Sequence, residues 1–367
     1  MWGLLIASMF ILSLLAIFYI AKKIQKLTIF NKIQNEKLKY IVSIASVVVI
    51  VGILWYLWGY MNAMICVLHL IVFWMLSEAI FHFVQKKKQF KRYWAGIIAI
   101  AFTIGYLFMG WQSAHYVVQT DYVVKTNKDV EELRIALISD SHVGATFHGD
   151  KFYEHLKTIE KQNPDMLVIA GDFVDDDTSK EDMIKSCEAL GKVRFKYGIY
   201  YVFGNHDKGY YDESYRGYNG DDLVEQLEKN NVVVLQDENV LIDNQYYLIG
   251  RNDRSELQRG GTRKEMSELV EGLDQDKLTI VLDHQPNDYQ NQSDANVDLV
   301  LSGHTHGGQL FPLMNIENLT GLGGDNQVYG YDKEKKTNFI VSSGISDWNI
   351  KFKTGCISEY VIVDIKK

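Results

Sequence analysis

Five short apolar runs in the later part of the chain each end in a cluster of Asp, Asn, His or Gly. The runs cover residues 133–139, 166–170, 199–203, 278–282 and 297–301. Their length and apolar character are those of buried strands, and segments with helical spacing lie between the early ones. Open α/β sheets build their sites at the carboxyl ends of strands, so the five endings can meet in one crevice. The pattern therefore predicts a layered α/β fold.

The segments around these runs predict the remaining elements. Apolar residues at helical spacing predict helices at 151–162, 180–196, 221–230 and 263–273, and alternation predicts an edge strand within 115–125.

The polar residues at the five run ends are of the types that bind divalent metals. In chain order they are Asp140 and His142, then Asp172, then Asn205 with His206 and Asp207, then His284, and last His304 and His306. Carboxylate and amide oxygens and imidazole nitrogens are ligands for such ions. Alternate residues of a strand point to one side, so His304 and His306 are expected to face one cleft. The alternative is a set of ordinary polar residues in loops and core, which five ordered motifs disfavour.

The motifs read D-x-H, G-D-x-x-D, G-N-H-D, a lone His, and G-H-x-H, from Asp140 to His306. This ordered set resembles the calcineurin-like metallophosphoesterases, and the resemblance covers about Leu133 to the end of the chain. It implies a four-layer α-β-β-α sandwich, in which two mixed sheets are covered by helices. It also implies a metal-dependent phosphoric ester hydrolase with two divalent ions, Mn, Fe or Zn, whose bridging hydroxide attacks the phosphorus.

The resemblance also implies the metal ligands. Asp172 would bridge the two ions. The first metal site would be completed by Asp140, His142 and His306, and the second by Asn205, His284 and His304.

Three further motif residues have implied roles beside the metals. His206 would be catalytic, because it would protonate the leaving oxygen or stabilise the developing charge. Asp207 would orient the His206 imidazole, and Asp175 would lie behind the ligands. For both carboxylates the alternative is a role in capping a loop.

The first part of the chain contains four apolar runs that are each long enough to span a bilayer. They cover residues 3–21, 40–58, 63–84 and 93–111. Basic loops at 22–39 and 86–92 are placed in the cytoplasm by the positive-inside rule, and the turn at 59–62 carries no charge. This predicts a four-helix transmembrane domain over 1–112 and a metallophosphoesterase domain over 113–367, on the extracytoplasmic side of the cell membrane.

The charge of the chain is unevenly distributed. The formal net charge is −8, yet residues 1–112 contain eleven Lys and Arg against Glu36 and Glu78 alone. The remainder is therefore strongly acidic, which makes a nucleic-acid partner a poor expectation. The three cysteines do not make a disulfide framework.

The stretch Gly303–Gln309, together with the apolar first part, is similar to the membrane-attached branch of the family. That branch includes bacterial phosphodiesterases that act on lipid-linked substrates and transmembrane proteins with a metallophosphoesterase domain. The expected substrate is therefore a phosphodiester or pyrophosphate, lipid-linked in the first instance. The alternatives are a broad phosphomonoesterase or protein phosphatase, and a non-catalytic membrane sensor or scaffold with a metal-binding domain.

Three features each have two interpretations. The Tyr-rich insert Tyr210–Tyr218 is either a lid over the substrate or a solvated loop. Glu78 and His82, four residues apart in the third apolar run, are either a functional pair or residues near headgroup water and lysines. Four arginines either contact phosphate or lie scattered on the surface: Arg251, Arg254, Arg259 and Arg263.

Overall fold

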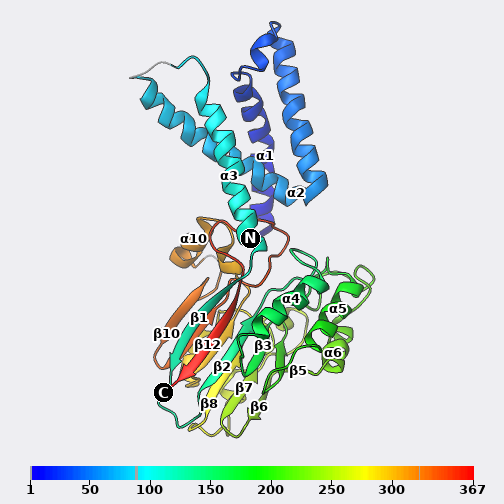
Figure 1. The fold of residues 1–367 in the computed structure, drawn as a ribbon, viewed down its shortest axis with the longest axis vertical. Helices are drawn as coiled ribbons and strands as arrows, with labels where there is room; N and C mark the ends of the chain where they lie inside the picture. Colours follow the sequence, from blue (N-terminus) through cyan, green and yellow to red (C-terminus); the bar gives the residue numbers. More distant parts are fainter. Residues whose placement is uncertain (1, 87–89, 322) are drawn as a thin grey trace. The chain divides into compact units, whose positions relative to one another are not determined.

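The computed structural model describes residues 2–86, 90–321 and 323–367, which form two compact units (Figure 1). The first unit is Met1–Trp111 with Asn349–Lys351, and the second is Gln112–Trp348 with Phe352–Lys367.

The first unit is helical. It contains α1 (Trp2–Ile24), a short 3₁₀ turn η1 (Phe30–Lys32), α2 (Glu36–Gln85) and most of α3 (Trp94–His115). Among the described residues, α2 and α3 are long and apolar enough to cross a membrane.

The four separate spans expected from the sequence are not reproduced as such. The second and third predicted spans both lie in α2, and the first lies in α1. Gly59 has φ 83° and ψ 162°, so α2 leaves helical geometry at the predicted turn. Part of the second basic loop, residues 87–89, lies outside the described residues.

Among the described residues, Glu78 in α2 contacts side chains in and just after α1 and just before α3. Its carboxylate pairs with Lys23 of α1 and accepts a hydrogen bond from the Tyr93 hydroxyl, and Lys26 lies 3.6 Å from it. Glu78 thus lies within reach of lysines, as the second interpretation expects, and is an ion-pair partner within the first unit. That the Glu78 and His82 pair lies near headgroup water stays a prediction.

The second unit contains two six-stranded mixed sheets. The first has the order β1 (Val118–Lys125), β12 (Glu359–Lys366), β2 (Leu133–Ile138), β3 (Met166–Ala170), β4 (Ile199–Val202), β5 (Val232–Val234). The second has the order β10 (Gly330–Glu334), β11 (Thr337–Val341), β9 (Leu299–Ser302), β8 (Leu278–Leu282), β7 (Tyr246–Gly250), β6 (Glu238–Ile242). Strands β2 to β5 are parallel to one another, as are β7, β8, β9 and β11.

The alternation of side chains along the strands builds the layers. Leu133, Ile135 and Leu137 of β2 enter the core that the two sheets share, whereas Ala136 and Ile138 enter the core under the outer helices. Because both faces are covered, these strands read as continuous apolar runs.

Helices cover the outer face of each sheet. On the first sheet they are α4 (Gly149–Glu160), α5 (Lys180–Leu190) and α6 (Gly220–Lys229). On the second they are α8 (Met266–Leu269) and α9 (Tyr289–Asp294), and α7 (Ser255–Gln258) lies in the loop after β7. The predicted arrangement of two mixed sheets covered by helices is confirmed.

Two predicted helices are wrong in extent. The helix expected at 180–196 ends at Leu190 in α5, and the helix expected at 263–273 shrinks to α8, because the residues before it bond elsewhere. Lys264 N–H donates to Asp237 at 2.8 Å, and Arg263 donates to the Asn252 carbonyl at 2.7 Å. The sequence also did not predict β10, α9, α10 (Leu313–Thr320) or the 3₁₀ turn η2 (His306–Gly308).

Candidate metal centre and active site

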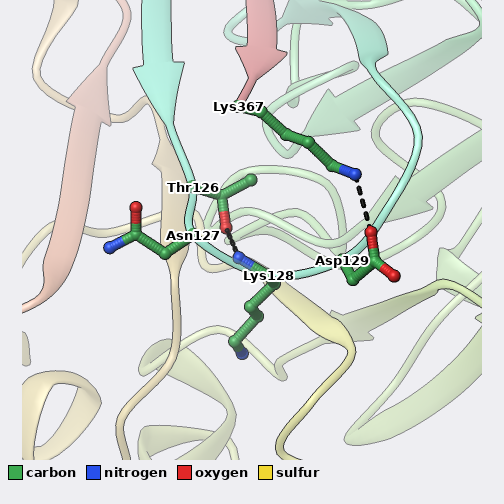
Figure 2. A pocket seen from close by; sticks show the side chains of 5 residues that line it. All are labelled: Thr126, Asn127, Lys128, Asp129 and Lys367. Carbon is green, nitrogen blue, oxygen red and sulfur yellow. Dashed lines mark hydrogen bonds and ion pairs between the residues drawn. The ribbon is translucent and has the colours of Figure 1, made fainter.

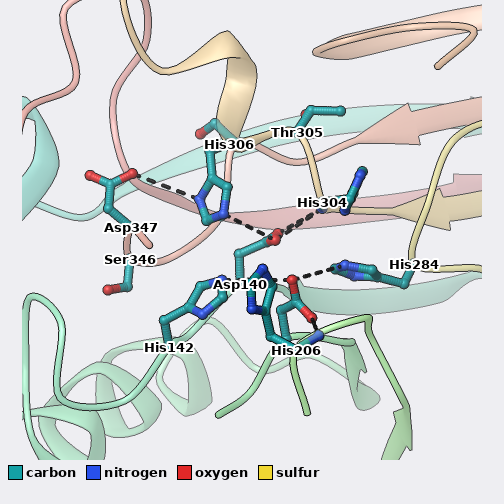
Figure 3. A network of polar contacts seen from close by, with 12 residues as sticks. Asp140, His142, His206, His284, His304, Thr305, His306, Ser346 and Asp347 are labelled. Atoms are coloured by element: carbon teal, nitrogen blue, oxygen red, sulfur yellow. Dashed lines mark hydrogen bonds and ion pairs between the residues drawn. The ribbon is translucent and has the colours of Figure 1, made fainter. Parts of the chain in front are cut away.

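The five predicted strand ends meet at one edge of the two sheets, because β2, β3 and β4 run parallel in one sheet and β8 and β9 in the other. Figure 3 shows the side chains that these ends deliver, with histidines from both sheets around Asp140.

Six of the predicted ligands form two groups. One group is Asp140, His142 and His306, and the other is Asp172, His284 and His304. Within each group the ligand atoms all lie within 4.8 Å of one another. Each group takes residues from both sheets, so the site exists only when the sheets pack together.

Asp172 connects the two groups. Its Oδ2 lies 3.1 Å from His284 Nε2 in one group and 3.7 Å from His142 Nε2 in the other. The seventh predicted ligand, Asn205, joins the second group, where its Oδ1 lies 3.2 Å from His284 Nε2. The structure therefore brings all seven predicted ligands together around a shared carboxylate.

Two histidines are oriented by hydrogen bonds behind them. His284 Nδ1 donates to the Ala170 carbonyl at 2.7 Å, and His142 Nδ1 donates to Asp175 Oδ2 at 3.0 Å. Both rings therefore present Nε2 to the centre, as metal-binding histidines do. Asp175 lies behind the ligands, as expected, and its other oxygen also caps the loop by accepting from Asp177 N–H at 2.9 Å.

The donor set fits a pair of divalent cations. The groups offer carboxylates, an amide oxygen and imidazoles, which suit Mn, Fe or Zn. His142 Nε2 is buried without a hydrogen-bond partner among the described residues. Such an atom costs about 1–3 kcal/mol if left unpaired, and a cation would satisfy it.

The electrostatics also favour bound cations. Burial opposes the charged form of Asp172, but the neighbouring histidines hold the pKa of this carboxyl well below its usual range. Burial likewise opposes charge on His142, but the hydrogen bond that it donates to Asp175 and the nearby carboxylates raise its pKa to about 9. Charges are thus paired inside a buried site, and a metal ion would displace protons from the imidazoles.

His304 and His306 reach the site in a different way from the expected one. Strand β9 ends at Ser302, so alternation along a strand does not place them. Both residues instead have positive φ, 74° and 49°, in a tight left-handed turn that continues into η2. This turn directs the two rings to different metal groups. Both rings reach the metal centre, as predicted, but the predicted cause, alternation along one strand, is wrong.

Glycines of the motifs make room for the ligands. A Cβ on Gly204 would lie 2.2 Å from Asp172 Oδ1, and one on Gly303 would lie 2.3 Å from Asp140 Oδ2. Any side chain at either position would displace a ligand carboxylate.

Asp207 does not orient the His206 imidazole. Its carboxylate accepts four backbone N–H groups, from Asp172, Phe173, Val174 and Gly204, at 2.6–3.0 Å. The assignment of Asp207 to catalysis is therefore corrected: this buried carboxylate caps the loop that carries Asp172. The physical reason is that four converging N–H groups need an acceptor once they are buried.

His206 lies beside the ligand groups. Its backbone N–H donates to Asp172 Oδ1 at 2.8 Å, and its ring centroid is 5.1 Å from that of His142. Two partly exposed aromatic rings flank it, Trp348 at 5.0 Å and Tyr210 at 5.1 Å. Burial lowers the pKa of His206, although Asp172 opposes this shift.

Sequence reasoning missed Asp347 and Lys353, which are fully buried. Asp347 Oδ1 lies 3.7 Å from His306 Nδ1 and 3.3 Å from Lys353 Nζ, and Lys353 also donates to the Ser343 carbonyl at 2.7 Å. Burial raises the pKa of Asp347 to about 7, against the effect of Lys353. Asp347 lies in the loop after β11, which is parallel to β9. The search for polar residues after parallel strands, which found the other site residues, could therefore have found Asp347 as well.

The arginines are mostly structural. Arg251 is buried and pairs with Asp283 at 3.3 Å, and Arg263 pairs with the same carboxylate at 2.9 Å. Arg259 donates to the Asn205 carbonyl at 3.1 Å. The surface interpretation is therefore wrong for Arg251 and Arg263, whereas Arg259 is exposed, as that interpretation expects. The contacts of these arginines are satisfied within the protein and do not require a phosphate.

The Tyr-rich insert is held at both ends. Near its start, Tyr210 accepts a hydrogen bond from Asn205 Nδ2 at 2.8 Å. Near its end, the buried Arg216 donates to the Asp207 carbonyl at 2.8 Å. Tyr211 and Tyr215 between them are exposed. Tyr210 thus reaches the site, and whether the insert covers a substrate stays a prediction.

A separate hollow of about 330 Å³ lies at the amino-terminal end of β2, away from the ligand residues at its carboxyl end (Figure 2). Its two lysines are already paired, Lys128 with Asp298 at 2.6 Å and Lys367 with Asp129 at 2.7 Å. We assign it no function.

Comparison with known proteins agrees with this geometry. Residues 133–308 match the family model of the calcineurin-like phosphoesterases. An uncharacterized metallophosphoesterase of Aquifex aeolicus is 34% identical over 194 residues, which cover 52% of this chain and 70% of that protein.

Two further relatives extend the comparison. An uncharacterized metallophosphoesterase of Campylobacter jejuni is 33% identical over 241 residues, covering 64% of this chain and 60% of that protein. A Bos taurus protein named as a transmembrane protein with a metallophosphoesterase domain is 33% identical over 198 residues. These residues cover 50% of this chain and 42% of that protein. The matched part of the chain covers 58–60% of the length of the Campylobacter relative and of two Helicobacter pylori relatives. It belongs to the calcineurin-like metallophosphoesterases, a family of metal-dependent phosphoester hydrolases.

Proposed function

We propose that this protein is a membrane-anchored phosphoesterase with two metal ions that hydrolyses phosphodiester or pyrophosphate bonds. The observation that carries the proposal is the pair of ligand groups joined by Asp172, with His206 beside them. When bound, the two cations would activate a water molecule and neutralise charge on the phosphate.

The protein's own residues would supply the rest of the chemistry. Asp140, His142 and His306 would hold one cation, and Asn205, His284 and His304 the other, with Asp172 shared. His206 would give a proton to the leaving oxygen or stabilise its charge, because its ring lies next to both His142 and the exposed aromatic rings. The exposed side of that ring is where a leaving group could enter.

We further propose four membrane spans, with the catalytic domain on the extracytoplasmic side. Basic loops at 22–39 and 86–92 and the uncharged turn at Gly59 support this orientation. Helix α3 ends at His115 and β1 begins at Val118, so only two residues separate a candidate span from the first strand of the domain. Such a short connection favours substrates held in the outer leaflet, lipid-linked ones first, and disfavours cytosolic nucleotides.

The test is hydrolysis by the purified full chain with Mn²⁺, Fe²⁺ or Zn²⁺. We expect turnover of bis(p-nitrophenyl) phosphate above that of Asp172→Asn, which serves as the control. A preference for p-nitrophenyl phosphate would favour the phosphomonoesterase alternative. No turnover above the control with any of the three ions would favour the sensor or scaffold. The complete ligand set together with His206 favours an enzyme over the sensor or scaffold, because a domain that only binds a ligand needs no acid to protonate a leaving group.

A further inference from the structure

Helix α10 and Phe311, two residues before it, expose several large apolar side chains to solvent. None of the residues of α10 is buried. Phe311 is 60% exposed, Leu313 44%, Ile316 40% and Leu319 86%. These four residues are called the α10 apolar surface below. Several large apolar side chains exposed along one short segment indicate a contact site, because their exposure to water is unfavourable.

The α10 apolar surface adjoins the metal centre in the chain. The ligand turn ends with His306, five residues before Phe311. Phe311 N–H donates to Thr354 Oγ1 at 3.0 Å, and the N–H groups of Thr354 and Gly355 donate to the Gln309 carbonyl at 2.9 and 3.1 Å. The start of the apolar surface is therefore fixed to the segment 354–358.

The same segment is fixed to the end of α3. Ser358 N–H donates to the Ser113 carbonyl at 2.9 Å, and Ser358 Oγ donates to the Ala114 carbonyl at 2.9 Å. Ser113 and Ala114 lie in the last turn of α3, a helix that is long and apolar enough to cross a membrane. Thr354 and Ser358 are four residues apart, which limits their separation to about 14 Å. The α10 apolar surface thus begins close to the point where α3 would leave a bilayer.

We propose that the α10 apolar surface inserts into the surface of the lipid bilayer from which α3 emerges. The ligand turn with His304 and His306 would then lie at headgroup level, so the site would take phosphoesters whose lipid part stays in the membrane. This substrate class rests on the proposed function, whereas the insertion rests only on α3 spanning the bilayer. Residues 310–320 contain no Lys or Arg, so the insertion needs no anionic lipid.

A fluorescence experiment on the full chain tests the insertion without any assay of activity. Leu319→Cys, in a background that lacks the three native cysteines, is labelled with bimane and placed in nanodiscs of phosphatidylcholine with or without brominated acyl chains. The matched control is Leu241→Cys, which is 40% exposed on β6, at the end of the second unit opposite to α10 (Figure 1).

We expect the bromines to lower the fluorescence at position 319 about twofold and to leave position 241 unchanged, because an interfacial helix buries its apolar face about 5–10 Å deep. Equal quenching at the two positions would overturn the proposal. Quenching that needs anionic lipid would also overturn it, as would cross-linking of two chains through Leu319→Cys, which would make a second copy the occupant.

A second experiment tests the substrate class. The variant with Ser at all four positions of the α10 apolar surface should lose about tenfold in hydrolysis of a bilayer-embedded phosphodiester and keep its rate on bis(p-nitrophenyl) phosphate. The control carries Leu241→Ser. Equal rates of variant and control on the embedded substrate would refute the substrate class. Failure of the proposed function itself would appear differently, as no hydrolysis of the soluble diester by the wild type.

Discussion

Asp172 has a carboxylate that reaches ligand atoms in both metal groups. We expect Asp172→Ala to lose both cations, whereas His142→Ala should chiefly weaken the group that contains Asp140 and His306. Metal analysis after equilibrium dialysis against Mn²⁺ measures this, with the exposed Asp129→Asn as a control. A wild-type protein that binds no more than one equivalent would contradict the two-metal arrangement.

His206 is the residue whose chemistry can be separated from metal binding. His206→Ala should keep its metals, because its side chain is not in either ligand group. It should lose about 10²–10⁴-fold in turnover of diesters with poor leaving groups, since a positioned acid contributes this much. Good leaving groups need no proton, so their loss should be smaller. Steady-state rates of wild type and His206→Ala on diesters with leaving groups of different pKa test the acid role. An equal loss of rate for all leaving groups would favour pure charge stabilisation.

At the scale of elements, the loop between β3 and α5 depends on Asp207. Asp207→Asn replaces one acceptor oxygen with an NH₂ group that faces backbone donors, so we expect a loss of about 1.5–3 kcal/mol in the free energy of unfolding. Urea unfolding measures it, with the exposed Glu154→Gln as the matched control. If Asp207 oriented His206 instead, the pH profile of turnover at saturating Mn²⁺ would shift while stability stayed near that of the control.

Metal removal tests whether the centre couples the two sheets. Each ligand group contains residues that follow strands of both sheets, so cations should stabilise the folded domain. At a free Mn²⁺ concentration about 100 times the dissociation constant, binding adds about 2.7 kcal/mol. We expect chelation to lower the melting temperature by about 5–10 °C, and resupplied Mn²⁺ to restore it. Asp172→Asn should respond much less, and an equal response would place the stabilising cation elsewhere.

At the scale of the whole molecule, the prediction concerns the side of the membrane. In a background without the native cysteines, Lys367→Cys should react in intact cells with a membrane-impermeant maleimide, because the catalytic domain follows the last predicted span. Lys91→Cys, in the second basic loop, should react only after lysis. The reverse pattern would exclude both the orientation and substrates of the outer leaflet.

The sequence by itself predicted the residues of the candidate metal centre and the strands that carry them. Ligand identity is local information: an apolar strand followed by Asp, Asn or His is visible in a few residues, and the parallel direction of strands brings such ends to one edge. The sequence also offered loop capping as an alternative role for Asp207, but it could not decide between the two roles. Three of the four N–H groups that donate to Asp207 belong to residues far from it in the chain, and only Gly204 is near.

The family resemblance already implied which ligands share a group, and the structure agrees with it. Only the tertiary structure decided which backbone turn separates His304 from His306, and which residues lie behind them. The divergence depends on left-handed backbone angles that tertiary contacts maintain. Asp347 and Lys353 carry no motif, and their pairing in the interior depends on how β11 and the closing loop pack beside His306. The exposure of α10 is likewise a property of packing, since a short apolar stretch in a sequence reads equally well as core.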